Sequence, residues 1–127
     1  MEILIDTSIW IDYFKGGGQS AGLDFLISEN AIVTNDIILA ELIPFIHAKK
    51  ELELISLLQA IKKYPLNIPW DQIIDYQIRC LQGGANGIGI PDLIIAQNAI
   101  QTECPVYTLD RHFTLMAEIL GLRLYTL

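Results

Sequence analysis

The chain has 127 residues, of which 52% are hydrophobic, and its formal net charge is −7. That length fits one ordinary domain, so we expect a single domain over residues 1–127. The negative charge argues against a protein that holds nucleic acid by bulk positive charge, but it leaves room for a nuclease whose acids bind cations.

Short apolar segments alternate with helical patterns along the chain. In chain order, the first half contains an expected strand at 3–5, helices at 7–14 and 20–30, a strand at 31–34, and helices at 35–47 and 51–63. The second half contains a weak strand at 66–68, a helix at 69–82, a glycine-rich loop at 83–89, a helix at 91–103, a strand at 106–109, a helix at 110–120 and a last strand at 122–125. This alternation predicts an α/β domain with a parallel central sheet and helices on both faces.

Several helix ends carry residues that favour them. Ser20 and Asn35 are suited to cap the helices that begin beside them, because their side-chain oxygens can accept from free backbone N–H groups. Pro91 fits the first turn of its helix. Pro44 is expected to kink or divide the helix at 35–47.

Four carboxylates stand where the pattern predicts buried hydrocarbon: Asp6, Glu41, Asp92 and Asp110. A buried, unpaired carboxylate is costly, and Arg111 is the one base within these apolar stretches. A hard divalent cation is the simplest partner that all of these acids could share.

Asp6 and Asp110 each follow a short apolar strand. The ordinary role of an aspartate in that place is to cap the next helix. Open parallel sheets, however, bind ligands at the carboxyl ends of their strands, and neighbouring strands would bring both carboxylates to one edge. Two like charges there would repel each other and raise one pKa unless a cation intervenes.

Asp92 and Glu41 lie on helices. Asp92 lies in the first turn of the helix at 91–103, where a carboxylate interacts favourably with the helix dipole. It also lies at the start of the apolar stripe of that helix, and not on the polar face. Glu41 lies within the apolar stripe of the helix at 35–47, and no lysine or arginine precedes Lys49 there. We interpret Glu41 as a functional or metal-binding acid, with a salt bridge as the alternative, and the role of Asp36 stays open.

Other signatures are missing from the sequence. Cys80 and Cys104 do not make a disulfide framework and are interpreted as packing residues. His47 and His112 have no metal-ligand spacing with each other or with the cysteines. The glycine loop at 83–89 lacks the Lys-Ser/Thr ending of a phosphate-binding loop.

The sequence contains no apolar run of the length that a membrane span needs, which is about 18 residues. Its start, Met1-Glu2-Ile3, lacks the basic residues of a signal peptide. A cytoplasmic location is therefore expected.

Four segments resemble the PIN domain family and, more narrowly, the toxins of VapBC-type toxin–antitoxin pairs. They are LIDTSIWID (4–12), ILAEL (38–42), GIPDLIIA (89–96) and YTLDRHF (107–113), and the likeness extends to GLRL (121–124). Four motifs in this order, in a chain of this length, form a specific pattern. The fold that the resemblance implies is a three-layer α/β/α sandwich with a mostly parallel central sheet.

The resemblance also implies a set of site residues. The acidic quartet maps onto Asp6, Glu41, Asp92 and Asp110, and a nearby hydroxyl maps onto Thr108, with Thr7 or Ser8 as less direct matches. The implied activity is Mg²⁺- or Mn²⁺-dependent cleavage of RNA by a homodimer that a cognate VapB-like antitoxin inhibits.

Carboxylate oxygens suit Mg²⁺ and Mn²⁺, and either ion would activate a water and steady the charge of a phosphodiester. Asp6, Asp92 and Asp110 are the expected metal ligands. Glu41 would bind metal, or position or deprotonate the water. The sequence does not distinguish one metal ion from two.

Three other kinds of protein compete with this interpretation. A phosphoryl-receiver domain would need a late lysine, and none follows Lys63. A haloacid-dehalogenase-type phosphatase would need a second aspartate two residues after Asp6, where Ser8 stands. The remaining alternative is a catalytically silent PIN-like module that binds a protein partner.

Overall fold

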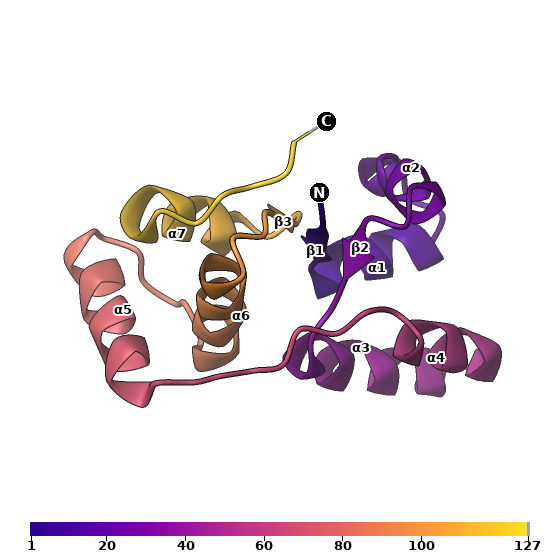
Figure 1. The fold of residues 1–127 in the computed structure, drawn as a ribbon, viewed down its shortest axis with the longest axis horizontal. Coiled ribbons are helices and arrows are strands. Elements are labelled where there is room, and N and C mark those ends of the chain that lie inside the picture. Colours follow the sequence, from indigo (N-terminus) through magenta and orange to yellow (C-terminus); the bar gives the residue numbers. More distant parts are fainter. Residues whose placement is uncertain (127) are drawn as a thin grey trace.

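A computed structural model describes residues 1–126. Its core is a three-stranded sheet in the order β2-β1-β3, in which β1 (Ile3–Ile5) lies between β2 (Ile32–Val33) and β3 (Val106–Tyr107) (Figure 1). Both pairings are parallel, and Leu4 lies opposite Val33 on one side and Val106 on the other. All three residues of β1 are buried, as expected for a strand covered on both faces.

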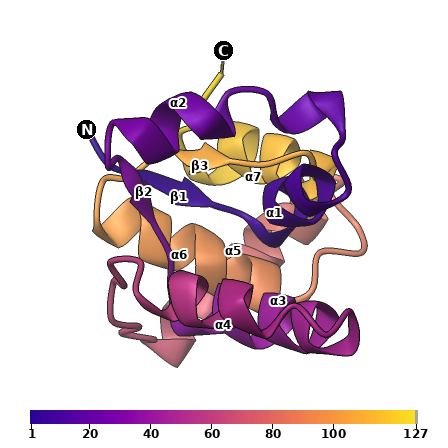
Figure 2. The same ribbon diagram turned by 90° about the vertical axis from the view of Figure 1, so that its right-hand side faces the viewer.

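Helices connect and cover the strands. The helices are α1 (Thr7–Phe14), α2 (Leu23–Ser28), α3 (Asp36–Ala48), α4 (Leu52–Gln59), α5 (Trp70–Gln82), α6 (Ile90–Gln101) and α7 (Arg111–Leu120), with a short 3₁₀ turn, η1, at Gly18–Ser20. In Figure 2 the sheet lies between α2 on one side and α6, with α3 and α4 beyond it, on the other. The three-layer α/β/α arrangement expected from the sequence is therefore confirmed.

Helix α6 forms the centre of the molecule. Every residue from Leu93 to Ala99 is buried, including the polar pair Gln97 and Asn98. Asn98 accepts a hydrogen bond from Asn35 Nδ2 at 2.9 Å and donates one to the carbonyl of Pro65 at 3.2 Å. Buried amides of this kind are tolerated only when they are paired, so these bonds fix how α6 sits against its neighbours.

The weak strand expected at 66–68 is wrong. Residues 64–69 adopt no regular structure, and their carbonyls instead accept from side chains of α6: Pro65 from Asn98, and Asn67 from Gln101 Nε2 at 2.9 Å. The bridge to β2 comes earlier, between Thr34 and Lys63. Side-chain amides thus satisfy the backbone that a strand would otherwise have paired.

Two further expectations need correction. Ser20 does not cap a helix at 20–30, because the chain forms η1 first and α2 begins at Leu23 with Gly22 as its N-cap. The last strand is reduced to one parallel bridge between Val106 and Leu124, which Tyr125 extends by donating its N–H to the Val106 carbonyl at 2.9 Å.

Other local predictions are confirmed. The side chain of Asn35 accepts from the N–H of Ile38 and so caps α3. Pro44 does not divide that helix, which runs unbroken from Asp36 to Ala48. Gly121 ends α7 with a φ of 80°, a left-handed conformation in which glycine is unstrained. Cys80 and Cys104 are both free and buried. Within residues 1–126, no helix combines the length and the apolar content that crossing a bilayer requires.

We predict that Asn98→Ala lowers the free energy of unfolding by about 2 kcal/mol or more, because Asn35 and the Pro65 carbonyl lose their buried partner. Gln101→Ala is the matched control on the same helix, and its exposed bond to the same segment should cost about 0.5 kcal/mol or less. Urea denaturation measures both values. Equal losses in the two variants would contradict this role for Asn98.

Candidate functional site

The pairing of β1 with β3 brings two of the expected acids to one edge of the sheet. Ile5 lies opposite Tyr107, and the N–H of Asp6 donates to the Tyr107 carbonyl at 3.0 Å. Asp6 is the N-cap of α1 and Asp110 is the N-cap of α7, so both aspartates leave the same end of the sheet. The cap interpretation and the site interpretation thus describe the same two residues.

Asp6 is the most buried of the four acids, with 5% of its surface exposed. Its Oδ2 atom accepts from the hydroxyls of Ser8 at 2.7 Å and Thr108 at 2.8 Å. Burial raises the pKa of Asp6, and the hydroxyl bonds oppose part of that rise. Both hydroxyls bind Oδ2, which leaves Oδ1 free of them as a potential ligand atom.

Thr108 and Ser8 connect this carboxylate to the loop before α7. Thr108 Oγ1 also accepts from the N–H of Asp110 at 2.9 Å. Ser8 Oγ accepts from the N–H of Leu109 at 2.9 Å and lies 3.3 Å from Thr108 Oγ1. The two hydroxyls therefore hold Asp6 and Asp110 in a fixed relation to each other.

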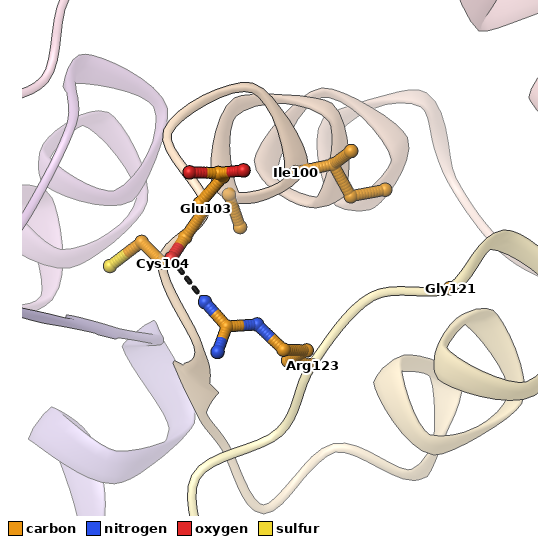
Figure 3. A pocket seen from close by; sticks show the side chains of 6 residues that line it. Ile100, Glu103, Cys104, Gly121 and Arg123 are labelled. Carbon is orange, nitrogen blue, oxygen red and sulfur yellow. Dashed lines mark hydrogen bonds between the residues drawn. The ribbon is translucent and has the colours of Figure 1, made fainter.

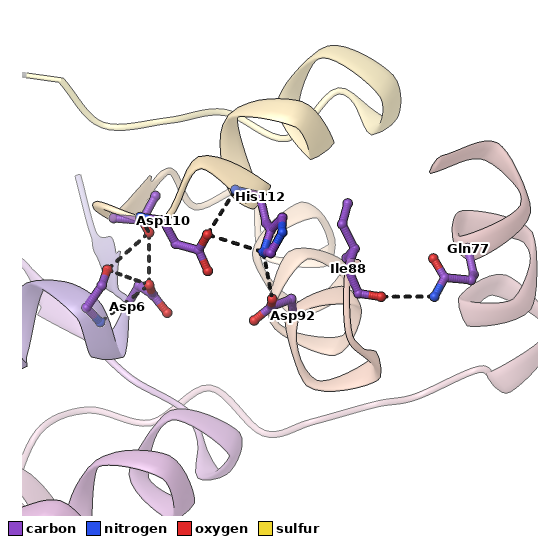
Figure 4. A network of polar contacts seen from close by, with 8 residues as sticks. Asp6, Gln77, Ile88, Asp92, Asp110 and His112 are labelled. Atoms are coloured by element: carbon purple, nitrogen blue, oxygen red, sulfur yellow. Dashed lines mark hydrogen bonds and ion pairs between the residues drawn. The ribbon is translucent and has the colours of Figure 1, made fainter. Parts of the chain in front are cut away.

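A third acid comes from the start of α6. One ligand atom each from Asp92, Asp110 and His112 lie within 4.8 Å of one another, and each residue is half-buried. His112 Nδ1 lies 3.3 Å from Asp110 Oδ1 and 3.9 Å from Asp92 Oδ2 (Figure 4). This is a compact group of two carboxylates and one imidazole.

The surroundings of Asp92 disfavour its charged form. Burial raises the pKa of Asp92 to about 6, the charges of Asp110, Asp6 and Glu41 add to the rise, and His112 opposes it. The ion pairs that lysine and arginine form within residues 1–126 go to other acids: Glu2, Asp36 and Asp75. The site thus gathers negative charge that no lysine or arginine pairs with.

Glu41 lies near the site but is not buried as the sequence predicted. It is exposed, so the argument from a buried charge within an apolar stripe is wrong. Its Oε1 accepts from the Thr7 hydroxyl at 3.2 Å, which places it at the rim of the cluster. Partial desolvation of the carboxylate raises the pKa of Glu41, and the charges of Asp6 and Asp110 add to this.

His112 belongs to this group although the sequence shows no metal-ligand spacing between it and another histidine or cysteine. The available signal was its place two residues after Asp110, in the first turn of the helix that Asp110 caps. Asp36, which had been left open, pairs with Lys63 at 3.1 Å on the surface and takes no part in the cluster.

A hollow with a volume of about 460 Å³ lies at the other end of α6 (Figure 3). Its lining residues are Ala99, Ile100, Glu103, Cys104, Gly121 and Arg123. Arg123 donates to the backbone carbonyl of Glu103, and burial raises the pKa of the Cys104 thiol to about 11. A thiol with that pKa is largely protonated at neutral pH, which makes it a poor nucleophile.

The profile of the PIN domain family matches residues 3–119. The chain therefore belongs to the PIN domain family. A search of curated protein sequences finds no match.

Solved structures share the fold over nearly the whole chain. VapBC2 from Rickettsia felis, bound to a DNA fragment from its promoter, has a TM-score of 0.75 at 22% identity and covers 98% of both chains. FitAcB from Neisseria gonorrhoeae has a TM-score of 0.73 at 24% identity, covering 98% of this chain and 96% of that one. VapBC-1 from nontypeable Haemophilus influenzae has a TM-score of 0.68 at 23% identity, covering 98% and 97%.

The site's electrostatics predict how stability depends on pH without metal. Because folding raises the pKa of Asp92 to about 6, the folded state loses stability as the pH rises from its unfolded pKa, about 3.9, through about 6. Asp92→Asn should therefore raise the melting temperature by several degrees in EDTA at about pH 7.5, and by less at about pH 5.

Asp71→Asn is the matched control, because Asp71 is an exposed aspartate in the first turn of another helix. It should leave the melting temperature unchanged or slightly lower, since only a helix-dipole contribution is lost. A drop in melting temperature for Asp92→Asn at both pH values would show that the carboxylate is not under electrostatic strain.

Proposed function

We propose that this chain is a metal-dependent endoribonuclease and the toxin component of a toxin–antitoxin pair. The observation that carries the proposal is the cluster of acids at the carboxyl end of the sheet of this PIN fold. No lysine or arginine within residues 1–126 forms an ion pair with these acids. Asp92, at the start of α6, and Asp110 and His112, at the start of α7, offer ligand atoms within 4.8 Å of one another, and Thr108 links Asp6 to this group. Burial raises the pKa of Asp92 to about 6, and the charges of Asp110, Asp6 and Glu41 add to the rise. Capping alone would not require such a gathering.

The donor set fits a divalent cation. Asp6, Asp92 and Asp110 are the proposed metal ligands, and their oxygens match the preference of Mg²⁺ and Mn²⁺. When bound, the cation would activate a water and neutralise charge that develops on the phosphodiester. Ser8 and Thr108 fix the Asp6 carboxylate, so little reorganisation is needed when it acts as a ligand.

Glu41 and Thr108 have supporting roles in this proposal. Glu41 is exposed at the rim and its pKa is raised, which suits a group that positions or deprotonates an attacking water. Thr108 orients both Asp6 and the backbone that leads to Asp110. Thr7 holds Glu41.

The proposed partners are an RNA substrate, a cognate VapB-like antitoxin and a second copy of the chain. Similarity to the VapBC structures supports an antitoxin as partner.

Exposed apolar surface supports protein partners in general. An exposed stripe on α5 contains Trp70, Ile74, Ile78 and Leu81. A groove of about 330 Å³ lies between α1 and α4, lined by Trp10, Tyr13, Phe14, Ile27, Ile32, Leu54, Leu57, Leu58 and Ile61. The single domain over residues 1–127 and the cytoplasmic location stay predictions.

A catalytically silent module that binds a protein partner is the alternative function. The same apolar surfaces favour it. The acidic cluster argues against this alternative. Repulsion among its charges lowers the stability of the fold, and a protein that binds partners through other surfaces would gain nothing from it. Metal titration separates the two functions, because only the nuclease needs the cation.

We predict that Mn²⁺ or Mg²⁺ raises the melting temperature of the wild-type chain, because the cation binds the assembled site and not the unfolded chain. Asp6→Asn should remove most of this shift while the fold, followed by circular dichroism, stays intact. Asp36→Asn, which alters an exposed acid outside the cluster, is the control and should keep the shift. An undiminished shift in Asp6→Asn would rule out the metal assignment.

We also predict that the wild-type chain cleaves single-stranded RNA when Mn²⁺ is present and not in EDTA. Asp92→Asn should lose at least about 100-fold in rate, since it removes a proposed ligand. Gel analysis of a labelled RNA measures the cleavage, with Asp71→Asn purified in parallel as the active control. Equal residual cleavage by the wild type and Asp92→Asn would indicate a contaminating nuclease.

A further inference from the structure

We propose that His112 is a metal ligand through Nδ1, and that it gives the centre a preference for Mn²⁺ and later transition cations over Mg²⁺. The inference rests on the proposed metal function and deepens it. It adds a nitrogen donor to a site that the sequence described as carboxylate only.

The spacing of the donor atoms supports ligation. Around a cation with bonds of about 2.1 Å, neighbouring ligand atoms lie about 3.0 Å apart and opposite ones about 4.2 Å apart. His112 Nδ1 lies 3.3 Å from Asp110 Oδ1 and 3.9 Å from Asp92 Oδ2, between those two limits. Nδ1 thus lies at ligand–ligand distance from an oxygen of each carboxylate, and one atom from each of the three residues lies within 4.8 Å of the others.

The same distances do not describe a tight ion pair. A charged N–H···O bond between imidazole and carboxylate is about 2.7–2.9 Å long. The Asp110 oxygen nearest the ring, Oδ1, already accepts from the backbone N–H of His112 at 2.9 Å. Nδ1 therefore approaches two carboxylates without making a short bond to either one.

The start of α7 positions the imidazole beside the glycine loop that precedes α6. The backbone of His112 is fixed in the first turn of α7 by the cap that Asp110 provides. On the far side, a Cβ built on Gly87 would lie 3.8 Å from His112 Nε2, so a larger residue at position 87 would reach the ring edge. Gly87 has a φ of 82°, which favours glycine there.

A nitrogen ligand changes which cation the site prefers. Mg²⁺ favours oxygen ligands and keeps several waters, whereas imidazole is a common ligand of transition cations. Two carboxylates with one imidazole form a mixed set that accepts Mn²⁺, Co²⁺ or Zn²⁺ and gains little from the nitrogen when it binds Mg²⁺.

The test uses the full chain and two cations. His112→Phe keeps a flat ring against Gly87 but removes the donor, so affinity for Mn²⁺ should fall at least about 10-fold while affinity for Mg²⁺ changes less than about 2-fold. Isothermal titration calorimetry measures both. His47→Phe is the matched control, because His47 is exposed in the last turn of α3 and is the only other histidine. Equal losses for both cations would assign His112 a positioning role and overturn ligation.

A spectroscopic measurement tests ligation even if His112→Phe fails to fold. In wild type loaded with Mn²⁺, electron spin-echo modulation should show a directly bound nitrogen, and labelling only histidine with ¹⁵N should change that modulation. The signal should persist in His47→Gln. Bound Mn²⁺ with no effect of the label would overturn the assignment and leave the proposed metal site standing. No binding of Mn²⁺ or Mg²⁺ would overturn both.

Discussion

The parallel pairing of β1 with β3 is the constraint on which the candidate site depends. It sets Asp6 beside the end of β3, and the hydroxyls of Thr108 and Ser8 then join Asp6 to the loop that leads into Asp110. A shift of one residue in this register would turn those side chains to opposite faces of the sheet. The geometry of the acids follows from main-chain hydrogen bonds more than from any contact between the acids themselves.

Helix α6 supplies the third acid, and its packing offsets the loss of stability that the clustered acids cause. Like charges in a half-buried position oppose folding, and Asp92 shows this most clearly. The opposing contribution comes from the buried run Leu93 to Ala99 and from the amide bonds of Asn98. A PIN domain can thus hold acids that repel one another, because the helix carrying one of them is packed on all sides.

Much of the fold could be predicted from local pattern. Buried strands such as 3–5 are continuous apolar runs, and Asn35 and Gly121 mark helix ends through interactions within a few residues. The segment 66–68 could not be predicted in this way. The carbonyl of Asn67, and that of Pro65 just before the segment, accept from side chains of α6 more than thirty residues later in the sequence. Patterns in a single sequence do not register such distant partners.

The sequence by itself determined the alternation of helix and strand, the four motif segments that resemble the PIN family, and the place of Asp6 and Asp110 as caps of the helices that follow β1 and β3. Only the tertiary structure decided that Glu41 is exposed at the rim and that His112 lies within 4 Å of two carboxylates. The physical reason is that burial and donor spacing depend on how α3, α6 and α7 pack around the sheet. A helical stripe shows which residues share a face, but not which part of that face another element covers.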